Sequence, residues 1–238
     1  NGNKLKDGIA LSFKASAIQK NGFADAVAAY NKVPTESADV DVIKASLAAG
    51  KDVKLTNKIS NKTIVAQNGG VATLDLNGFD VDGIRSSFGN RCAINVSGSG
   101  TVLTIEGQGK VDGRGYSSQM SNAVKVEGGA KAIINDGTYT TGLDYNKKLN
   151  AVIFVNVGTV EINGGFFYNA DNAGEWVLNC QDGTDSHIIV QGGTFVNFNP
   201  ADNAAEGQGT NFVAEGYHVE SAQQDNGDIW YTVVKDAE

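Results

Sequence analysis

Residue types that carry metal or enzyme chemistry are scarce in this chain of 238 residues. It has two histidines, two cysteines, two prolines and one methionine, against thirty glycines. So few histidines and cysteines, without the spacing of a zinc site, exclude the common structural zinc motifs. No phosphate-binding P-loop, dinucleotide-binding fingerprint or serine nucleophile elbow is present. The sequence therefore lacks the motifs of several widespread enzyme classes.

Long hydrophobic runs and an excess of positive charge are also missing. No apolar run approaches the about 20 residues that a transmembrane helix needs, and no signal-peptide pattern opens the chain. Asp and Glu number 27 against 19 Lys and Arg, which gives a net charge of −8. Because proteins hold nucleic acid mainly by neutralising phosphates with Lys and Arg, we expect no nucleic-acid partner. We also expect no membrane span.

What the chain does have is an internal repeat. The stretch "VEINGGFFYN" at 160–169 has near-copies at 74–83, 104–113, 133–142 and 189–198. In each copy an apolar strand ends at one or two glycines, with Asn or Asp beside the glycine at 77–78, 135–137 and 163–165, and another apolar residue follows. The apolar residues before the glycines follow one another at steps of 29, 29, 28 and 28 residues: Leu76, Ile105, Ile134, Ile162 and Val190. So even a spacing indicates a repeat architecture.

Each repeat holds three short apolar strands separated by glycine-containing turns. A period of about 28 residues is too short for a propeller blade and has no helix for a leucine-rich repeat. It fits one coil of a solenoid, so we predict an all-β, single-stranded right-handed parallel β-helix. Inward residues should then stack from coil to coil in two ladders, one of Ile105, Ile134, Ile162 and Val190, the other of Val81, Val111, Tyr139, Phe167 and Phe195.

Both ends of such a solenoid need covering, because the terminal coils expose unpaired strand edges. At the N-terminal end we predict a capping helix over 38–49, with Ser37 as N-cap and Gly50 at its end. Its inner face would carry Val40, Ile43 and Leu47. At the C-terminal end, two strands around the turn "QQDNGD" predict a hairpin in which Trp230 and Tyr231 cover the last coil.

The cysteines are 88 residues apart, close to three repeats. At about 4.8 Å per coil, Cys92 and Cys180 would be separated by roughly 14 Å, beyond the about 7 Å that a disulfide allows between Cα atoms. We therefore predict two buried free thiols.

The first 33 residues do not follow the repeat, so we divide the chain into an N-terminal arm, 1–33, and a β-helix with its caps, 34–238. The arm contains an alternating strand whose apolar face includes Ile9, Leu11 and Phe13. Such a face invites pairing with a partner, and we predict that it anchors the protein. The open alternative is that it folds back as an elaborated cap over the first coil.

Insertions fall at one place in the coil, after the third strand. Loops that leave a solenoid on one side commonly form its working face. These are rich in Asn, Asp, Ser and Gly and carry the aromatic residues Phe88, Tyr116 and Tyr145, which we take as candidates for glycan contact. The alternative is that they are plain solvated loops.

The helix followed by a first strand, and coils of 28–29 residues, resemble the pectate-lyase-like right-handed parallel β-helix family. The tail "GGTFVNFNPADNAAEGQGTNFVAEGYHV…WYTVV" looks like the last coil of β-helical proteins from bacteriophages (head fibre or tail-spike-like) and of uncharacterised proteins from gut bacteria. The resemblance covers roughly residues 37–238. It implies a structural role and homotrimeric assembly.

The enzymes of that family carry motifs that can be sought here. Galacturonan hydrolases use Gly-His-Gly and Arg-Ile-Lys motifs, which this chain lacks, and its two histidines, His187 and His218, are expected to be structural. Pectate lyases use a cation held by carboxylates. Asp82 and Asp112 occupy equivalent places in adjacent coils, about 5 Å apart, and are candidate calcium ligands. The alternative is a surface ladder of Asp offset by Arg85 and Arg114.

Taken together, these features predict a non-enzymatic virion structural protein, namely a head fibre, capsid decoration or tail-spike-like subunit. We expect no cofactor, with calcium as the one open possibility, and no catalytic residues. Expected partners are its own copies, other virion proteins through the arm, and host-surface polysaccharide. The alternative is a secreted bacterial β-helix protein that binds or cleaves an acidic polysaccharide.

Overall fold

The computed structural model describes residues 33–84, 91–113, 121–141, 151–170 and 176–237. The chain divides into two compact units, Asn1–Val33 and Pro34–Glu238, and all described residues except Val33 belong to the second. The strand predicted in the arm, with Ile9, Leu11 and Phe13, lies outside the described residues.

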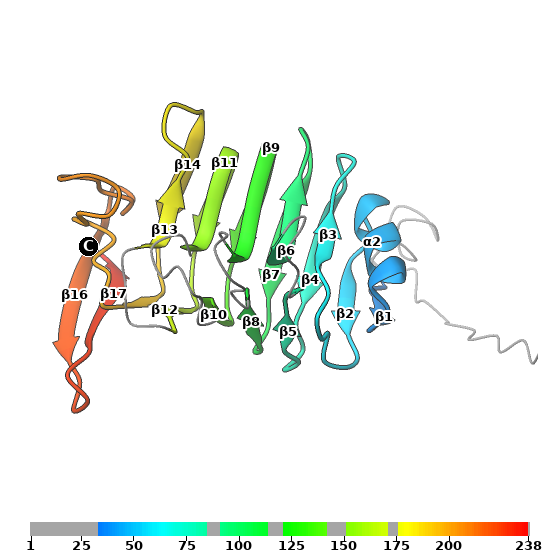
Figure 1. Ribbon diagram of the computed structural model, residues 1–238, viewed down its shortest axis with the longest axis horizontal. Helices are drawn as coiled ribbons and strands as arrows, with labels where there is room; N and C mark the ends of the chain where they lie inside the picture. Colours follow the sequence, from blue (N-terminus) through cyan, green and yellow to red (C-terminus); the bar gives the residue numbers. More distant parts are fainter. Residues whose placement is uncertain (1–32, 85–90, 114–120, 142–150, 171–175, 238) are drawn as a thin grey trace, which may run out of the picture. The chain divides into compact units, whose positions relative to one another are not determined.

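The second unit is a parallel β-solenoid whose successive coils stack along its length (Figure 1). Its first fifteen strands are β1 (Thr35–Ser37), β2 (Val53–Leu55), β3 (Ile64–Ala66), β4 (Val71–Asp75), β5 (Val81–Asp82), β6 (Cys92–Ser97), β7 (Val102–Glu106), β8 (Lys110–Asp112), β9 (Asn122–Ile134), β10 (Thr138–Thr141), β11 (Ala151–Ile162), β12 (Phe166–Asn169), β13 (Trp176–Cys180), β14 (Ser186–Val190) and β15 (Thr194–Val196). They form a larger sheet of ten strands and, with β16 and β17, a smaller sheet of seven. One helix, α2 (Val40–Ala48), is present among the described residues. The predicted all-β parallel solenoid is thus confirmed.

The aliphatic ladder lies on the inner side of the larger sheet. Ile105 pairs with Ile134, Ile134 with Ile162, and Ile162 with Val190, all in parallel register. In the preceding coil the partner of Ile105 is Leu74, and not Leu76, the residue that marks this coil in the spacing of the repeat. Leu76 is also buried, but it follows β4, where its N–H already bonds Glu106 of the next coil. If the repeat were evenly spaced, Leu76 would stand opposite Ile105. Because Leu74 stands there instead, the turn after β4 begins two residues earlier in its coil.

The second ladder is confirmed along the smaller sheet. Val81 pairs with Val111, and the register continues through Tyr139, Phe167 and Phe195. The three rings stack almost in parallel, with centroids 5.0 Å apart between Tyr139 and Phe167 and 4.9 Å between Phe167 and Phe195. All three side chains are fully buried. An in-register solenoid thus turns one repeated aromatic position into a continuous stack.

Glycine and asparagine form the corner between the two sheets. Gly165 and Gly193 have φ of +105° and +93°, a region that side chains with a Cβ rarely adopt. Asn163 donates from Nδ2 to Oδ1 of Asn135 one coil earlier, at 3.0 Å. The corner of the quoted repeat is therefore a backbone requirement, which explains why the sequence repeats it.

Helix α2 packs against the first strands of the solenoid, and Ile43 and Leu47 on its inner face join the buried core. Its N-cap is Asp39, not the predicted Ser37. The Asp39 carboxylate accepts hydrogen bonds from the backbone N–H groups of Asp41 (2.9 Å) and Val42 (3.5 Å). Ser37 instead accepts from the N–H of Asp39 at 3.0 Å. The helix begins later because the carboxylate serves two of its free N–H groups.

The C-terminal hairpin consists of β16 (Tyr217–Gln223) and β17 (Ile229–Lys235), which pair in antiparallel fashion. Strand β17 also pairs antiparallel with β15 and so covers the last coil of the smaller sheet. Tyr231 stands opposite Phe195 at the end of the aromatic ladder. Trp230, expected to cover the coil as well, is 38% exposed. Adjacent residues of a strand point to opposite faces, so one of the two aromatic residues had to lie outside.

Neither cysteine forms a disulfide. Cys92 is buried and Cys180 is only partly buried, so the prediction of two buried thiols was right for the first alone. No helix in the described part of the chain is long and apolar enough to cross a membrane.

Candidate functional site

Asp82 and Asp112, the candidate calcium ligands, are direct partners in strands β5 and β8. Asp82 is 5% exposed, and Lys58 places its Nζ 2.8 Å from Oδ2 of Asp82. Lys110 lies 3.8 Å from Asp112. Each carboxylate thus already has a cation beside it, and within the described residues no group of three or more potential metal ligands is found. Arg85 and Arg114 lie outside those residues.

The histidines belong to strands, as expected, but each contacts a carboxylate. His187 in β14 lies 2.8 Å from Asp185, and His218 in β16 lies 2.6 Å from Asp236. Both pairs are largely solvent-exposed. Exposed pairs of this kind contribute little to stability, and neither histidine is among the residues that line the two clefts described below.

The aromatic residues predicted to contact glycans, Phe88, Tyr116 and Tyr145, lie outside the described residues. Another of the insertions found in the sequence, residues 199–211, is described in full. Two neighbouring clefts open along it, with volumes of about 600 Å³ and 480 Å³. They share Trp176, Ala204 and Ala205 as lining residues. These clefts are within the ~300–1,000 Å³ typical of small-molecule sites.

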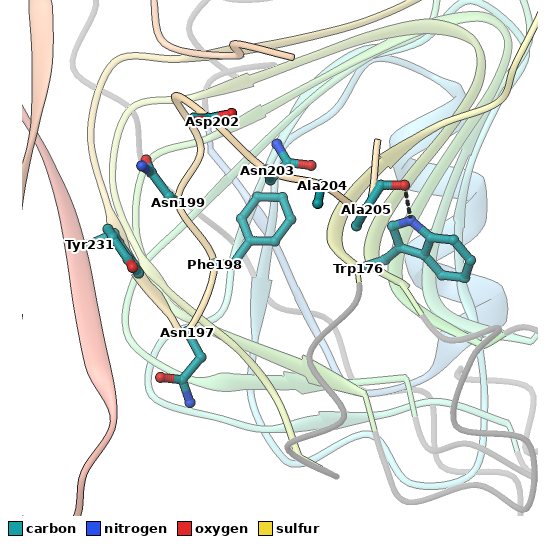
Figure 2. Close-up of a pocket in the computed structure, with 9 residues that line it drawn as sticks. All are labelled: Trp176, Asn197, Phe198, Asn199, Asp202, Asn203, Ala204, Ala205 and Tyr231. Atoms are coloured by element: carbon teal, nitrogen blue, oxygen red, sulfur yellow. Dashed lines mark hydrogen bonds between the residues drawn. The ribbon is translucent and has the colours of Figure 1, made fainter. Parts of the chain in front are cut away.

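The larger cleft, which we call the Trp176 cleft, is drawn in Figure 2. Its lining residues are Trp176, Asn197, Phe198, Asn199, Asp202, Asn203, Ala204, Ala205 and Tyr231. In that view Trp176 and Tyr231 stand at opposite ends of the row of side chains, with Phe198 and Asn203 between them. The lining therefore combines aromatic rings with amide and carboxylate groups.

Two hydrogen bonds fix the geometry of this cleft. The indole Nε1–H of Trp176 donates to the carbonyl of Ala205 at 2.9 Å, which is the contact dashed in Figure 2. Asn203 accepts at Oδ1 from the N–H of Glu206 at 3.0 Å. The insertion is thereby held against a strand one coil earlier, and the indole ring has a set orientation.

The smaller cleft contains a perturbed carboxyl group. Glu206 accepts a hydrogen bond at Oε2 from the backbone N–H of Cys180 at 3.0 Å. Burial raises the pKa of the Glu206 carboxyl; the bond from Cys180 opposes this shift and the charge of Asp182 adds to it. Burial, helped by Glu206, also raises the pKa of the Cys180 thiol to about 12. A thiol with such a pKa is a poor nucleophile.

A separate aromatic cluster lies on the outer face of the smaller sheet. The Phe166 ring meets that of Trp230 edge-on with centroids 5.0 Å apart, and its centroid is 6.0 Å from that of Tyr168. We call Phe166, Tyr168 and Trp230 the outer aromatic cluster. These side chains point away from the core because they alternate with Phe167, a member of the aromatic ladder, and with Tyr231, which stands opposite Phe195 of that ladder.

Sequence reasoning missed both the Trp176 cleft and the outer aromatic cluster. Trp176 opens β13 and pairs with Ala151 one coil earlier. At this position the preceding coil has the small, buried Ala151, whereas this coil has a large indole ring. This difference in side-chain size was the signal in the sequence for the cleft. For the cluster, the signal was the alternation in "GGFFYN", where Phe166 and Tyr168 share one face and Phe167 the other.

Comparison with known proteins finds no matching family model, no similar curated protein and no similar solved structure.

Proposed function

We propose that this protein is a non-enzymatic structural protein of a bacteriophage virion, a head fibre, capsid decoration or tail-spike-like subunit that assembles as a homotrimer. The observation that carries the proposal is the outer aromatic cluster. Aromatic residues are enriched in protein interfaces and supply much of their binding energy. The virion setting and the right-handed winding rest on the resemblance of the repeat and tail to phage β-helices.

The cluster suits contact between copies of one chain. Its three rings stand on regular strands rather than on loops, so neighbouring copies would meet a rigid surface. The acidic net charge of −8 opposes association in general, which makes an apolar contact the favourable route. Helix α2 covers the first coils and β17 covers the last coil of the smaller sheet, whereas the cluster lies on the side of the solenoid, so we expect lateral rather than end-to-end assembly.

Light scattering coupled to size-exclusion chromatography tests the proposal. We expect the full chain to elute as a trimer and the double variant Phe166→Ser, Trp230→Ser to elute as a folded monomer. Val71→Ser serves as a matched control, because Val71 is 62% exposed but belongs to β4 of the larger sheet. A wild-type monomer at high micromolar concentration, or a double variant that remains trimeric, would refute assembly through this cluster.

Residues 1–33 are assigned the anchoring role in this proposal, from their sequence alone. A shortened chain that begins at Pro34, the first residue of the second unit, keeps β1 (Thr35–Ser37). It should remain a folded solenoid by circular dichroism and lose binding to the particle. If the segment is a cap instead, the shortened chain should aggregate or melt at a markedly lower temperature.

The alternative is a secreted protein that binds or cleaves an acidic polysaccharide, with calcium held by carboxylates. The adjacent Asp82 and Asp112 are the observation in its favour. A screen for cleavage of galacturonan and other uronate polymers, with and without calcium, decides between the two. Product release by the wild type that disappears in the double variant Asp82→Asn, Asp112→Asn would establish the alternative.

A further inference from the structure

We propose that the Trp176 cleft binds a neutral oligosaccharide. This inference names a site and a ligand class for the host-surface glycan contact included in the expected partners, and to that extent it rests on the proposed function. Three properties of the cleft support carbohydrate binding: its aromatic walls, its polar groups that the fold does not use, and its charge.

The aromatic walls suit the apolar face of a sugar ring. A pyranose presents C–H groups on its faces and hydroxyl groups around its edge, so it packs flat against indole or phenol rings. Trp176 and Tyr231 are both partly exposed and both line the cleft. The bond from Trp176 Nε1 to the Ala205 carbonyl holds the indole in place without a ligand. A preorganised ring loses little conformational freedom on binding.

The polar groups of the cleft divide into those used by the fold and those left for a ligand. Asn197 is used twice, since Nδ2 donates to Asp228 and Oδ1 accepts from the N–H of Ile229. By contrast, no hydrogen-bond partner for the Asp202 carboxylate is found among the described residues, and Asp202 is exposed at the cleft. A carboxylate can accept bonds from two adjacent sugar hydroxyls.

Asn203 provides an independent sign that the cleft is incomplete. This residue is only 7% exposed, and its Nδ2 has no hydrogen-bond partner in the described part of the chain. A buried donor without an acceptor is energetically costly and calls for an explanation. A sugar oxygen that enters as the insertion yields slightly would supply the missing acceptor.

Charge decides which sugars the cleft accepts. Asp202 lines the Trp176 cleft, and Asp182 and Glu206 line the smaller cleft beside it, whereas no Lys, Arg or His is among the described residues that line either cleft. A uronate would bring its negative charge toward these carboxylates and be repelled. The site therefore selects against the acidic polysaccharides of the alternative function and in favour of neutral glycans.

Tryptophan fluorescence tests this proposal on the full chain. The protein has two tryptophans, so Trp230→Phe leaves Trp176 as the sole reporter and keeps an aromatic ring in the outer cluster. The probes are hexasaccharides of glucose, mannose, galactose and N-acetylglucosamine, each to millimolar concentration, and hexagalacturonate as the acidic comparison. We expect a saturable change with at least one neutral probe and none with hexagalacturonate.

Variants then locate the binding. In the same background, Asp202→Ala should weaken binding of the responding sugar by at least about tenfold, equivalent to 1.4 kcal/mol. Asp225→Ala removes an exposed carboxylate in the hairpin turn and should leave binding unchanged. Trp176→Ala, followed by calorimetry, should abolish binding; if its folding is impaired, Asp202→Ala still decides the matter.

The proposal is overturned if no neutral probe responds, if hexagalacturonate binds as tightly as the neutral sugars, or if Asp202→Ala binds like the wild type. These outcomes are separable from failure of the proposed function. A trimer that ignores all neutral sugars refutes the site alone, whereas cleavage of any probe refutes the non-enzymatic role.

Discussion

Replacing Phe167 with alanine tests the claim that the aromatic ladder holds the coils in register. Phe167 is fully buried and is stacked on both sides, 5.0 Å from the Tyr139 ring and 4.9 Å from the Phe195 ring. A Phe→Ala substitution in a protein core lowers the free energy of unfolding by about 3–5 kcal/mol. The loss of two stacked ring pairs, each worth about 0.5–1.5 kcal/mol, is part of that cost. We expect the variant at the upper end of that range.

The site has little capacity to collapse around the smaller side chain. A Cβ placed on Gly165 or on Gly193 would come within 3.2 Å of the Phe167 ring, so backbone already encloses its edge. The neighbouring rings are themselves fixed by strand pairing on both sides. A cavity should therefore remain in the variant, and a residual cavity raises the cost of truncation.

Phe167→Leu separates stacking from volume. Leucine fills much of the space but cannot stack, so this variant should lose about 1–3 kcal/mol, the two ring pairs alone. The exposed Val71→Ala is the control and should change stability by less than about 0.5 kcal/mol.

Thermal and guanidinium unfolding, followed by circular dichroism, provide the measurement. At about 2–4 °C per kcal/mol for a chain of this size, Phe167→Ala should lower Tm by roughly 6–20 °C. A loss of less than about 1 kcal/mol, or an equal loss in Phe167→Leu, would refute the reasoning that stacked rings in a rigid enclosure stabilise the solenoid.

Two further predictions concern the corner and Glu206. Gly165→Ala should lower the free energy of unfolding by at least about 1 kcal/mol more than Gly183→Ala. Both glycines have positive φ, but only a Cβ at Gly165 would meet neighbouring atoms, among them the Gly137 carbonyl oxygen at 3.1 Å. Equal denaturant midpoints for the two variants would contradict this prediction. The raised pKa of Glu206 means that the folded state holds this proton more tightly than the unfolded state. Ionisation of Glu206 therefore destabilises the folded state, and this loss of stability develops as pH rises from the carboxyl pKa of the unfolded chain through the raised pKa of the folded state. Glu206→Gln should have a higher Tm than wild type at pH 7 and the same Tm in acid below the ordinary carboxyl pKa, while exposed Glu215→Gln should follow the wild type throughout.

The sequence alone determined the coil and most of its packing. An apolar residue at a constant place in a period of 28–29 residues can be buried in every copy only if the copies stack, so Ile105, Ile134 and Ile162 had to form a ladder. The same logic placed Tyr139, Phe167 and Phe195 together and made glycine necessary at the corner, where φ is positive at Gly165. These features follow from local periodicity, which the sequence displays directly.

Tertiary structure decided what periodicity does not encode. Leu74 rather than Leu76 meets Ile105 because strand pairing, not even spacing, sets the register where a turn is longer. Trp230 lies outside because the antiparallel pairing of β17 with β15 puts Tyr231 opposite Phe195. The Trp176 cleft arises only when the insertion at 199–211 folds back by one coil and its Ala205 carbonyl accepts the indole N–H. Contacts between an irregular loop and a strand depend on three-dimensional proximity, and no repeat in the sequence announces them.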